Sequence, residues 1–148
     1  MVNVNFYSVK LVKETAARYD VDNKIDNPTK AYNFLKETVN MEELAEENMY
    51  VLFLNVKNVV LGVHHASKGS LDMSIVHPRE IFKSAILCNS ARIIIAHNHP
   101  SGDVTPSRED ESVTKRLREA GKIIGIEVTD HLIIGDNNFL SMKEKGLL

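Results

Sequence analysis

A short apolar run followed by paired histidines constrains the fold of this chain more than any other feature. Ile93, Ile94 and Ile95 are β-branched and precede the sequence Ala-His-Asn-His, so they predict a buried strand that ends at the histidines. Alternate residues of an extended chain project to the same side. We therefore expect His97 and His99 to face the same way, where one cation could bind both imidazole rings.

A turn-rich loop follows the histidines and leads into a helix. Pro100, Gly102 and Pro106 predict the loop, and Ser107 is the expected N-cap of the helix that begins there. Asp110 then lies on the first helical turn and faces back toward the loop. Two imidazoles and one carboxylate, with a fourth position left for water, are typical of a catalytic zinc site.

Each of these residues also has a simpler interpretation. Ser107 and Asp110 fit a helix cap, in which Ser107 bonds a first-turn amide and the helix dipole favours the acidic side chain. His97 by itself fits an ordinary loop histidine. The combination of His-x-His after a strand with Ser-x-x-Asp a short loop away favours a metal site over these alternatives.

The same residues resemble a known motif. His97-x-His99, seven further residues and then Ser107-x-x-Asp110 look like the JAMM motif of the MPN-type zinc metalloproteases. The longer sequence HNHPSG followed by TPSRED resembles sequences of the RadC family, bacterial proteins traditionally labelled as DNA repair proteins. The likeness extends to residues 69–71, 74–83 and 130–135, and it covers about residues 47–148.

The resemblance implies a role for each motif residue. Zinc would be held by His97, His99 and Asp110, and the Ser107 hydroxyl would stabilise the oxyanion of the reaction. The family also uses a glutamate before an earlier strand as general base, because a carboxylate must take the proton of the attacking water. Glu47 matches that position, with its neighbour Glu46 as the alternative. From the residues alone, Glu47 fits a solvated charge in the acidic run 42–47.

The function expected from this set is zinc-dependent hydrolysis of peptide or isopeptide bonds in a protein substrate. A non-enzymatic DNA-repair or mobile-element accessory module, whose metal only steadies the fold, is the main alternative. A metal-dependent nuclease is less favoured because one metal site and an acidic pI fit it poorly. These ligand types would also suit an iron(II) site. Such a site normally needs a co-substrate pocket, and the sequence marks no arginine or other residue that would anchor a co-substrate. A zinc deaminase needs Pro-Cys-x-x-Cys, which the single Cys88 cannot supply.

Composition limits the partners and the location. The formal net charge is −2, with 18 basic and 20 acidic residues. The sequence therefore lacks the overall excess of positive charge that is typical of DNA-binding domains. One cysteine allows no intrachain disulfide and makes a cytoplasmic location the expectation. No apolar run approaches the roughly 20 residues of a membrane span, and no signal-peptide pattern is present. Substrate identity and oligomeric state are left open.

The chain is expected to form one α/β unit. Residues 1–26 are assigned to an N-terminal edge strand, from Asn3 to Val12, and a polar connection. Residues 27–148 are assigned to a single RadC-like JAMM/MPN domain, a mixed β-sheet sandwiched by helices that is similar to the cytidine deaminase fold. The resemblance implies a preceding helix-hairpin-helix DNA-binding domain, for which residues 1–26 leave no room. Helices are predicted at 28–46, 78–89 and 107–120, and strands at 49–54, 59–65, 93–96 and 123–134 with a closing strand or turn after 139.

The remaining histidines receive no assigned role in the site. Adjacent His64 and His65 would point to opposite faces of a strand, and His77 is expected to enter a helix in an extended conformation. His131 could support a metal ligand as a neutral partner or could fill a polar niche in the core. Cys88 is expected to be an inert core residue, and the basic patch at Lys115, Arg116, Arg118 and Lys122 is expected to be a solvated helix face.

Overall fold

A five-stranded mixed sheet forms the centre of the molecule. The computed structural model describes residues 1–69 and 76–148, so residues 70–75 of the family resemblance lie outside the described part. The strand order is β2-β1-β3-β4-β5. Their bounds are β1 Asn48–Leu54, β2 Val60–Lys68, β3 Arg92–Asn98, β4 Glu127–Ile134 and β5 Phe139–Ser141. β3 and β4 run parallel, whereas β1 pairs antiparallel with both β2 and β3, and β5 pairs antiparallel with β4.

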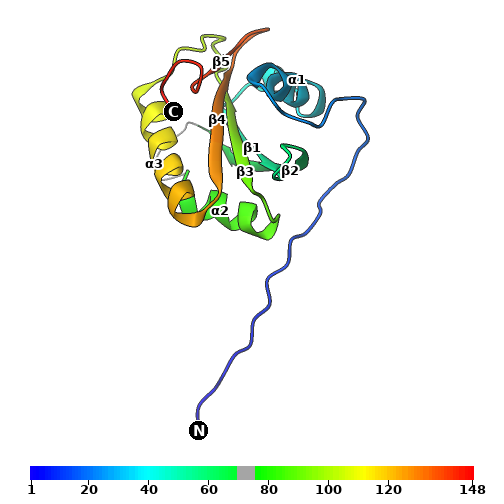
Figure 1. Ribbon diagram of the computed structural model, residues 1–148, viewed down its shortest axis with the longest axis vertical. Coiled ribbons are helices and arrows are strands. Elements are labelled where there is room, and N and C mark those ends of the chain that lie inside the picture. Colours follow the sequence, from blue (N-terminus) through cyan, green and yellow to red (C-terminus); the bar gives the residue numbers. More distant parts are fainter. Residues whose placement is uncertain (70–75) are drawn as a thin grey trace.

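Helices cover both faces of this sheet (Figure 1). α1, Pro28–Thr38, packs on one face, and α2, Pro78–Leu87, and α3, Arg108–Ile124, pack on the other. The alternation of β3 sets the two cores, because Ile93 and Ile95 contact the α2–α3 side while Ile94 and Ala96 contact the α1 side. This arrangement confirms the expected α/β fold with a mixed sheet between helices.

α1 ends earlier than the predicted 28–46. It stops at Thr38, and the single-turn 3-10 helix η1, Met41–Glu43, follows a break at Asn40. Asn40 adopts φ 54° and ψ 52°, a left-handed conformation that asparagine tolerates better than most residues. The acidic run 42–47 therefore lies in η1 and in the loop before β1, rather than in the last turns of a long helix.

α3 runs further than the predicted 107–120. Gly121 lies inside the helix, and Gly125 ends it with φ 84°, a conformation that favours glycine. A side chain at Gly121 would meet the carbonyl oxygen of Ile126 at 2.5 Å, so this glycine allows the helix to pack closely against the start of the next strand. Among the described residues, no helix has both the length and the apolar character needed to cross a bilayer.

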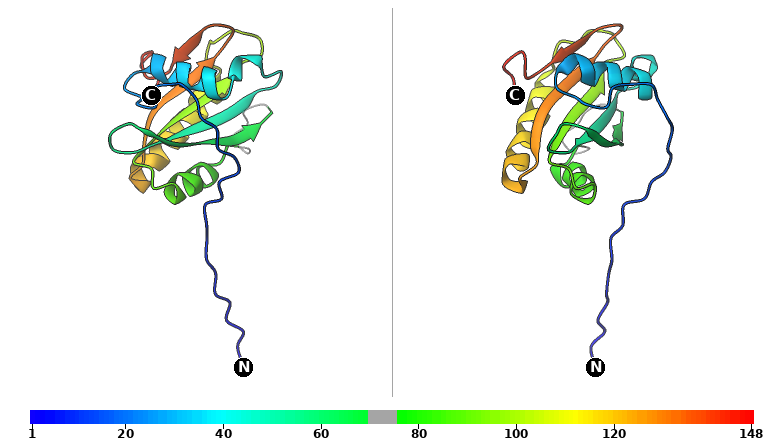
Figure 2. Two further views of the ribbon diagram at one scale, coloured as in Figure 1. Left: turned by 90° about the vertical axis from the view of Figure 1, so that its right-hand side faces the viewer. Right: turned by 45° about the vertical axis from the view of Figure 1, so that its right-hand side comes forward.

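The predicted strand from Asn3 to Val12 is wrong. Residues 1–20 have no regular secondary structure, their side chains are exposed, and they extend away from the folded body (Figures 1 and 2). Backbone pairing begins later, where Ile25 N–H donates to the Asn58 carbonyl at 2.8 Å and Val60 N–H donates to the Asn23 carbonyl at 2.9 Å. An alternating sequence indicates compatibility with a strand, but a strand also needs a partner.

Candidate metal centre

The two motif histidines lie where β3 ends. His97 is the penultimate residue of β3 and is fully buried, and His99 follows the strand, with its backbone N–H donating to the Ile134 carbonyl at 2.8 Å. Because His97 shares the alternation of Ile93 and Ile95, it faces α3. The sequence prediction that the strand delivers both histidines to one side agrees with this geometry.

The first turn of α3 brings the carboxylate to the histidines. Ser107 is the N-cap, its backbone N–H donates to Asp110 Oδ2 at 2.8 Å, and its Oγ accepts from Asp110 N–H at 3.1 Å. The capping interpretation of Ser107 and Asp110 is therefore confirmed. It does not exclude a second role, since the same hydrogen bonds fix the buried Asp110 carboxylate beside the histidines.

Three donor atoms converge at this point. Nε2 of His97 lies 3.0 Å from Nε2 of His99 and 3.2 Å from Oδ1 of Asp110, and Nε2 of His99 lies 3.4 Å from Oδ2 of Asp110. Ligand atoms about 2.0–2.2 Å from a tetrahedral zinc ion stand roughly 3.3–3.6 Å apart. The observed spacings are within a few tenths of an ångström of this range, so the three residues could hold a metal ion.

The orientation of His99 is fixed by the loop that follows it. Its Nδ1 lies 2.6 Å from the Asp103 carbonyl oxygen. A carbonyl can only accept, so Nδ1 carries the hydrogen and the neutral ring leaves a lone pair on Nε2. That lone pair is the one directed at His97 and Asp110, as a metal ligand requires.

A third histidine, His131 of β4, lies behind His97. Its Nε2 is 2.7 Å from His97 Nδ1, and its Nδ1 is 2.6 Å from Oγ1 of Thr114 on α3. The sequence left His131 open between a partner of a ligand and a core residue, and the structure places it in direct contact with a candidate ligand. Thr114 was missed, although its position four residues after Asp110 puts both on one face of a helix.

Burial and hydrogen bonding set the charges of these groups in opposite ways. Burial tends to raise the pKa of Asp110, but hydrogen bonds and charge interaction with His97, and hydrogen bonds from Ser107, outweigh it and hold that pKa well below its usual value. Burial, followed by the charge of His97, lowers the pKa of His131 well below its usual value. The site therefore combines an ionised carboxylate with a neutral buried imidazole.

Glu47 lies in the loop just before β1. Met49 of β1 is directly opposite His97, the last pair of the antiparallel β1–β3 pairing, and Glu47 precedes Met49 by two residues. Glu47 is half-buried, whereas Glu46 is exposed with an ion pair to Lys68 at 3.6 Å. The two-residue spacing from Met49 and the greater burial favour Glu47 over Glu46 as the candidate base, and the role itself stays a prediction.

Asn98 ties this loop to β3. Asn98 lies between His97 and His99 in sequence. Its side chain is buried and faces the side of the sheet opposite to His97. Its Oδ1 accepts from Asn48 N–H at 2.8 Å, and its Nδ2 donates to the carbonyls of Leu44 at 3.2 Å and Glu46 at 3.0 Å. The sequence analysis gave Asn98 no role, and its position inside the His-x-His motif is the signal that could have found it.

The other histidines and the cysteine make structural contacts. His65 bonds Asn48 Oδ1 at 2.8 Å and stacks on Tyr50, and His64 stacks on Phe53. His77 is extended, as expected, and caps α2 by accepting from Arg79 N–H. Cys88 packs at the edge of the α2–α3 core, and burial raises the pKa of its thiol.

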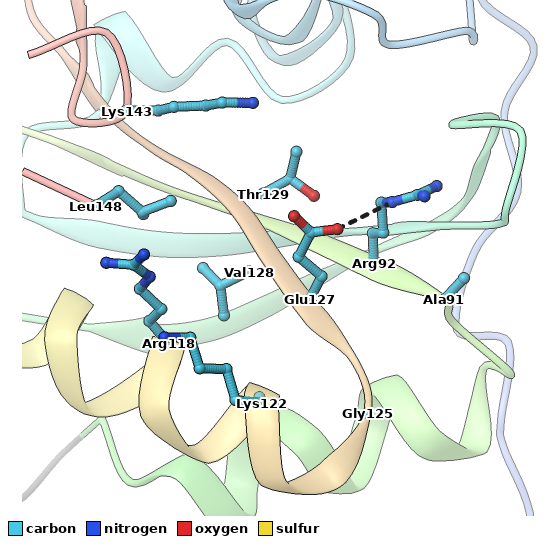
Figure 3. Close-up of a pocket in the computed structure, with 11 residues that line it drawn as sticks. Ala91, Arg92, Arg118, Lys122, Gly125, Glu127, Val128, Thr129, Lys143 and Leu148 are labelled. Carbon is cyan, nitrogen blue, oxygen red and sulfur yellow. Dashed lines mark hydrogen bonds and ion pairs between the residues drawn. The ribbon is translucent and has the colours of Figure 1, made fainter. Parts of the chain in front are cut away.

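A separate surface pocket lies at the far end of α3 (Figure 3). It is lined by Arg118 and Lys122 of α3, Thr129 of β4 and Lys143, and an ion pair joins Arg92 to Glu127 at its edge. The candidate metal ligands are not among the residues that line it. Part of the expected basic helix face therefore borders a hollow, apart from the His97–His99–Asp110 cluster.

Comparisons with known proteins agree with the geometry. A family model described as RadC-like JAB domain matches residues 25–147. A UPF0758 protein of Clostridium beijerinckii is 55% identical over 127 residues, which are 86% of this chain and 55% of that protein. A UPF0758 protein of Bacillus pumilus is 56% identical over 124 residues, 84% of this chain and 54% of that protein. The chain thus spans about half the length of the curated relatives it matches.

Proposed function

This chain belongs to the family of RadC-like JAB domains, and we propose that it is a zinc-dependent amide hydrolase acting on peptide or isopeptide bonds. The observation that carries the proposal is the convergence of two Nε2 atoms and one carboxylate at the end of β3. His97, His99 and Asp110 would hold the zinc ion, and this donor set leaves a fourth position open for catalysis. Bound zinc supplies Lewis acidity, which makes water acidic enough to lose a proton near neutral pH.

Glu47 has the role of general base in this proposal. It takes the proton of the attacking water and passes it to the leaving amine, so that neither a strong base nor an amide anion forms free in solution. Two observations support this assignment: Glu47 lies two residues before Met49, which pairs with His97, and Asn98 donates hydrogen bonds to the loop that carries Glu47.

Ser107 would donate a hydrogen bond to the developing oxyanion. Its Oγ already accepts from Asp110 N–H, which leaves its own hydrogen available to a substrate. Ser107→Ala should retain the zinc content and lower the rate about 10²- to 10³-fold, as expected for the loss of one oxyanion donor. Ser107→Thr, which keeps both the cap and the donor, is the matched control. Loss of zinc from Ser107→Ala would show that the hydroxyl is only a structural cap.

Elemental analysis of the purified protein is the primary test. We expect about one zinc per chain in the wild type and its loss in His97→Ala and Asp110→Ala, followed by cleavage of peptide or isopeptide-linked substrates that Glu47→Gln abolishes. A folded wild type that holds no zinc after zinc addition would refute the proposal.

One observation favours a second candidate function, a metal-stabilised accessory module without activity. His97 and Asp110 are buried and would cross-link β3 to α3 through the metal, as a structural ion does. Thermal unfolding with and without a chelator separates the two. A structural zinc should lower the melting temperature by many degrees when it is removed, because its binding energy is folding energy, while a catalytic zinc should change it less.

A further inference from the structure

A chain of short hydrogen bonds runs from His97 back to the helix that carries Asp110. His97 Nδ1 lies 2.7 Å from His131 Nε2, and His131 Nδ1 lies 2.6 Å from Thr114 Oγ1. Thr114 Oγ1 lies in turn 2.6 Å from the backbone carbonyl oxygen of Asp110. His97, His131 and Thr114 are all fully buried, so these contacts are made without competition from bulk water.

The hydrogens in this chain can be assigned by counting donors. The Asp110 carbonyl has no hydrogen, so Thr114 must donate to it. Among the described residues the only other acceptor near the Thr114 hydroxyl is the Met142 sulfur at 3.3 Å, which is weak. Thr114 has one hydrogen, so its oxygen accepts from His131 Nδ1–H. A neutral imidazole carries one N–H, so His131 Nε2 accepts from His97 Nδ1–H. His97 Nε2 is then left bare.

The opposite assignment is incompatible with metal binding. If His131 carried its hydrogen on Nε2, His97 Nδ1 would have to accept, and the neutral His97 would carry its hydrogen on Nε2. That atom faces His99 Nε2 and Asp110 Oδ1, and a protonated nitrogen cannot be a ligand. The tautomer of His131 therefore determines whether the candidate cluster offers two imidazole lone pairs or one.

We infer that His131 is a positioning residue that holds His97 in its metal-binding tautomer, and that Thr114 sets the orientation of His131. The inference rests on the proposed zinc site and deepens it. Most metal-binding histidines donate their second N–H to a carboxylate, a carbonyl or water. Here a second imidazole takes that place, and its own N–H is directed through Thr114 to the backbone of another ligand.

The test is the zinc affinity of Thr114→Val, measured by competition with a chromophoric chelator. Valine matches the shape of threonine but removes the acceptor for His131 Nδ1–H, and we expect zinc to bind about 10- to 100-fold more weakly. Thr114→Ser should restore near wild-type affinity. Thr129→Val is the matched control, because it makes the same change on β4 at a buried hydroxyl without a hydrogen-bond partner among the described residues.

A purely structural role for Thr114 would lower the melting temperature of the zinc-free protein and leave the zinc affinity unchanged, and that result would overturn the inference. NMR of the zinc-loaded wild type with ¹⁵N-labelled histidine gives a test that requires no variant. We expect His131 to be protonated on Nδ1, and protonation on Nε2 would also overturn the inference. A wild type that binds no zinc refutes the proposed function and this inference together, whereas zinc binding without amide hydrolysis refutes only the proposed function.

Discussion

Asn98→Asp tests whether the loop that carries Glu47 is held in place by β3. The substitution preserves the shape of the side chain and the oxygen that accepts from Asn48 N–H. It replaces the Nδ2 group, which donates to the carbonyls of Leu44 and Glu46, with an oxygen that faces those two acceptors. The change thus removes the hydrogen bonds to the loop without opening a cavity.

The magnitude follows from the two bonds. Each of the two hydrogen bonds contributes about 1 kcal/mol, and leaving the Leu44 carbonyl without a donor adds about 1–3 kcal/mol. The Glu46 carbonyl still accepts from Asn48 Nδ2 at 2.8 Å. Because Asn98 is only 2% exposed, little of this cost is relieved by water. We therefore expect Asn98→Asp to lower the free energy of unfolding by roughly 3–5 kcal/mol, a fall of roughly 10 °C in melting temperature for a chain of this size.

Two measurements distinguish an effect of Asn98→Asp on the Glu47 loop from an effect on the candidate metal site. Hydrogen exchange should become faster for amides of the segment around Glu47, including the Gly69 amide that donates to the Glu47 carbonyl at 2.8 Å. Under the proposed function, zinc content should match that of the wild type, because the candidate ligands His97 and Asp110 lie on the opposite side of the sheet from the Asn98 side chain, while turnover should fall.

Asn55→Asp is the control for the same chemical change. Asn55 uses its Oδ1 to accept from the amides of Lys57 and Val59, contacts that an aspartate keeps, so its stability should change by less than about 0.5 kcal/mol. Equal stability losses in Asn98→Asp and Asn55→Asp, or an Asn98→Asp protein with unchanged exchange and turnover, would refute the role given to Asn98.

Two further predictions concern stability. Gly121→Ala should destabilise the protein by about 1–3 kcal/mol in chemical denaturation, because the added Cβ would lie 2.5 Å from the Ile126 carbonyl oxygen and 3.1 Å from Phe82. This overpacking outweighs the roughly 1 kcal/mol that alanine gains in helix propensity. A more stable variant would contradict the packing described. The lowered pKa of Asp110 contributes stability that is present above the unfolded-state value of about 3.9 and is lost as the pH falls below it. Urea midpoints of the zinc-free protein should therefore drop between pH 5 and pH 3 more steeply in the wild type than in Asp110→Asn, and parallel curves would count against the contacts described as lowering the pKa of Asp110.

The sequence predicts the parts of the site that depend on local order. The β-branched run before His97 indicates a strand, and Ser107 marks the start of a helix, so both motif segments could be placed without knowledge of the fold. The predicted first helix is too long because the spacing of apolar residues does not show where a helix breaks. Asn40, a residue that tolerates the left-handed conformation, is the available signal for that break.

Long-range pairing accounts for what the sequence did not reveal. The contact between His97 and His131 depends on the register of β3 against β4, and that register is a property of the whole sheet. The strand expected from Asn3 to Val12 failed for the same reason, because alternation along one segment carries no information about a neighbouring strand.

The order in which the candidate site forms during folding follows from the β3-α3-β4 unit. Every candidate metal ligand, together with Thr114 and His131, lies within residues 92–134, where the two parallel strands are joined through α3. Thr114 and His131 are only 17 residues apart, whereas Asn48 and Asn98, whose bond anchors the Glu47 loop, are 50 apart. Contacts distant in sequence require a larger loss of chain entropy before they form. A nascent chain is therefore expected to complete the candidate metal cluster first and to add Glu47 afterwards, when β1 pairs with β3.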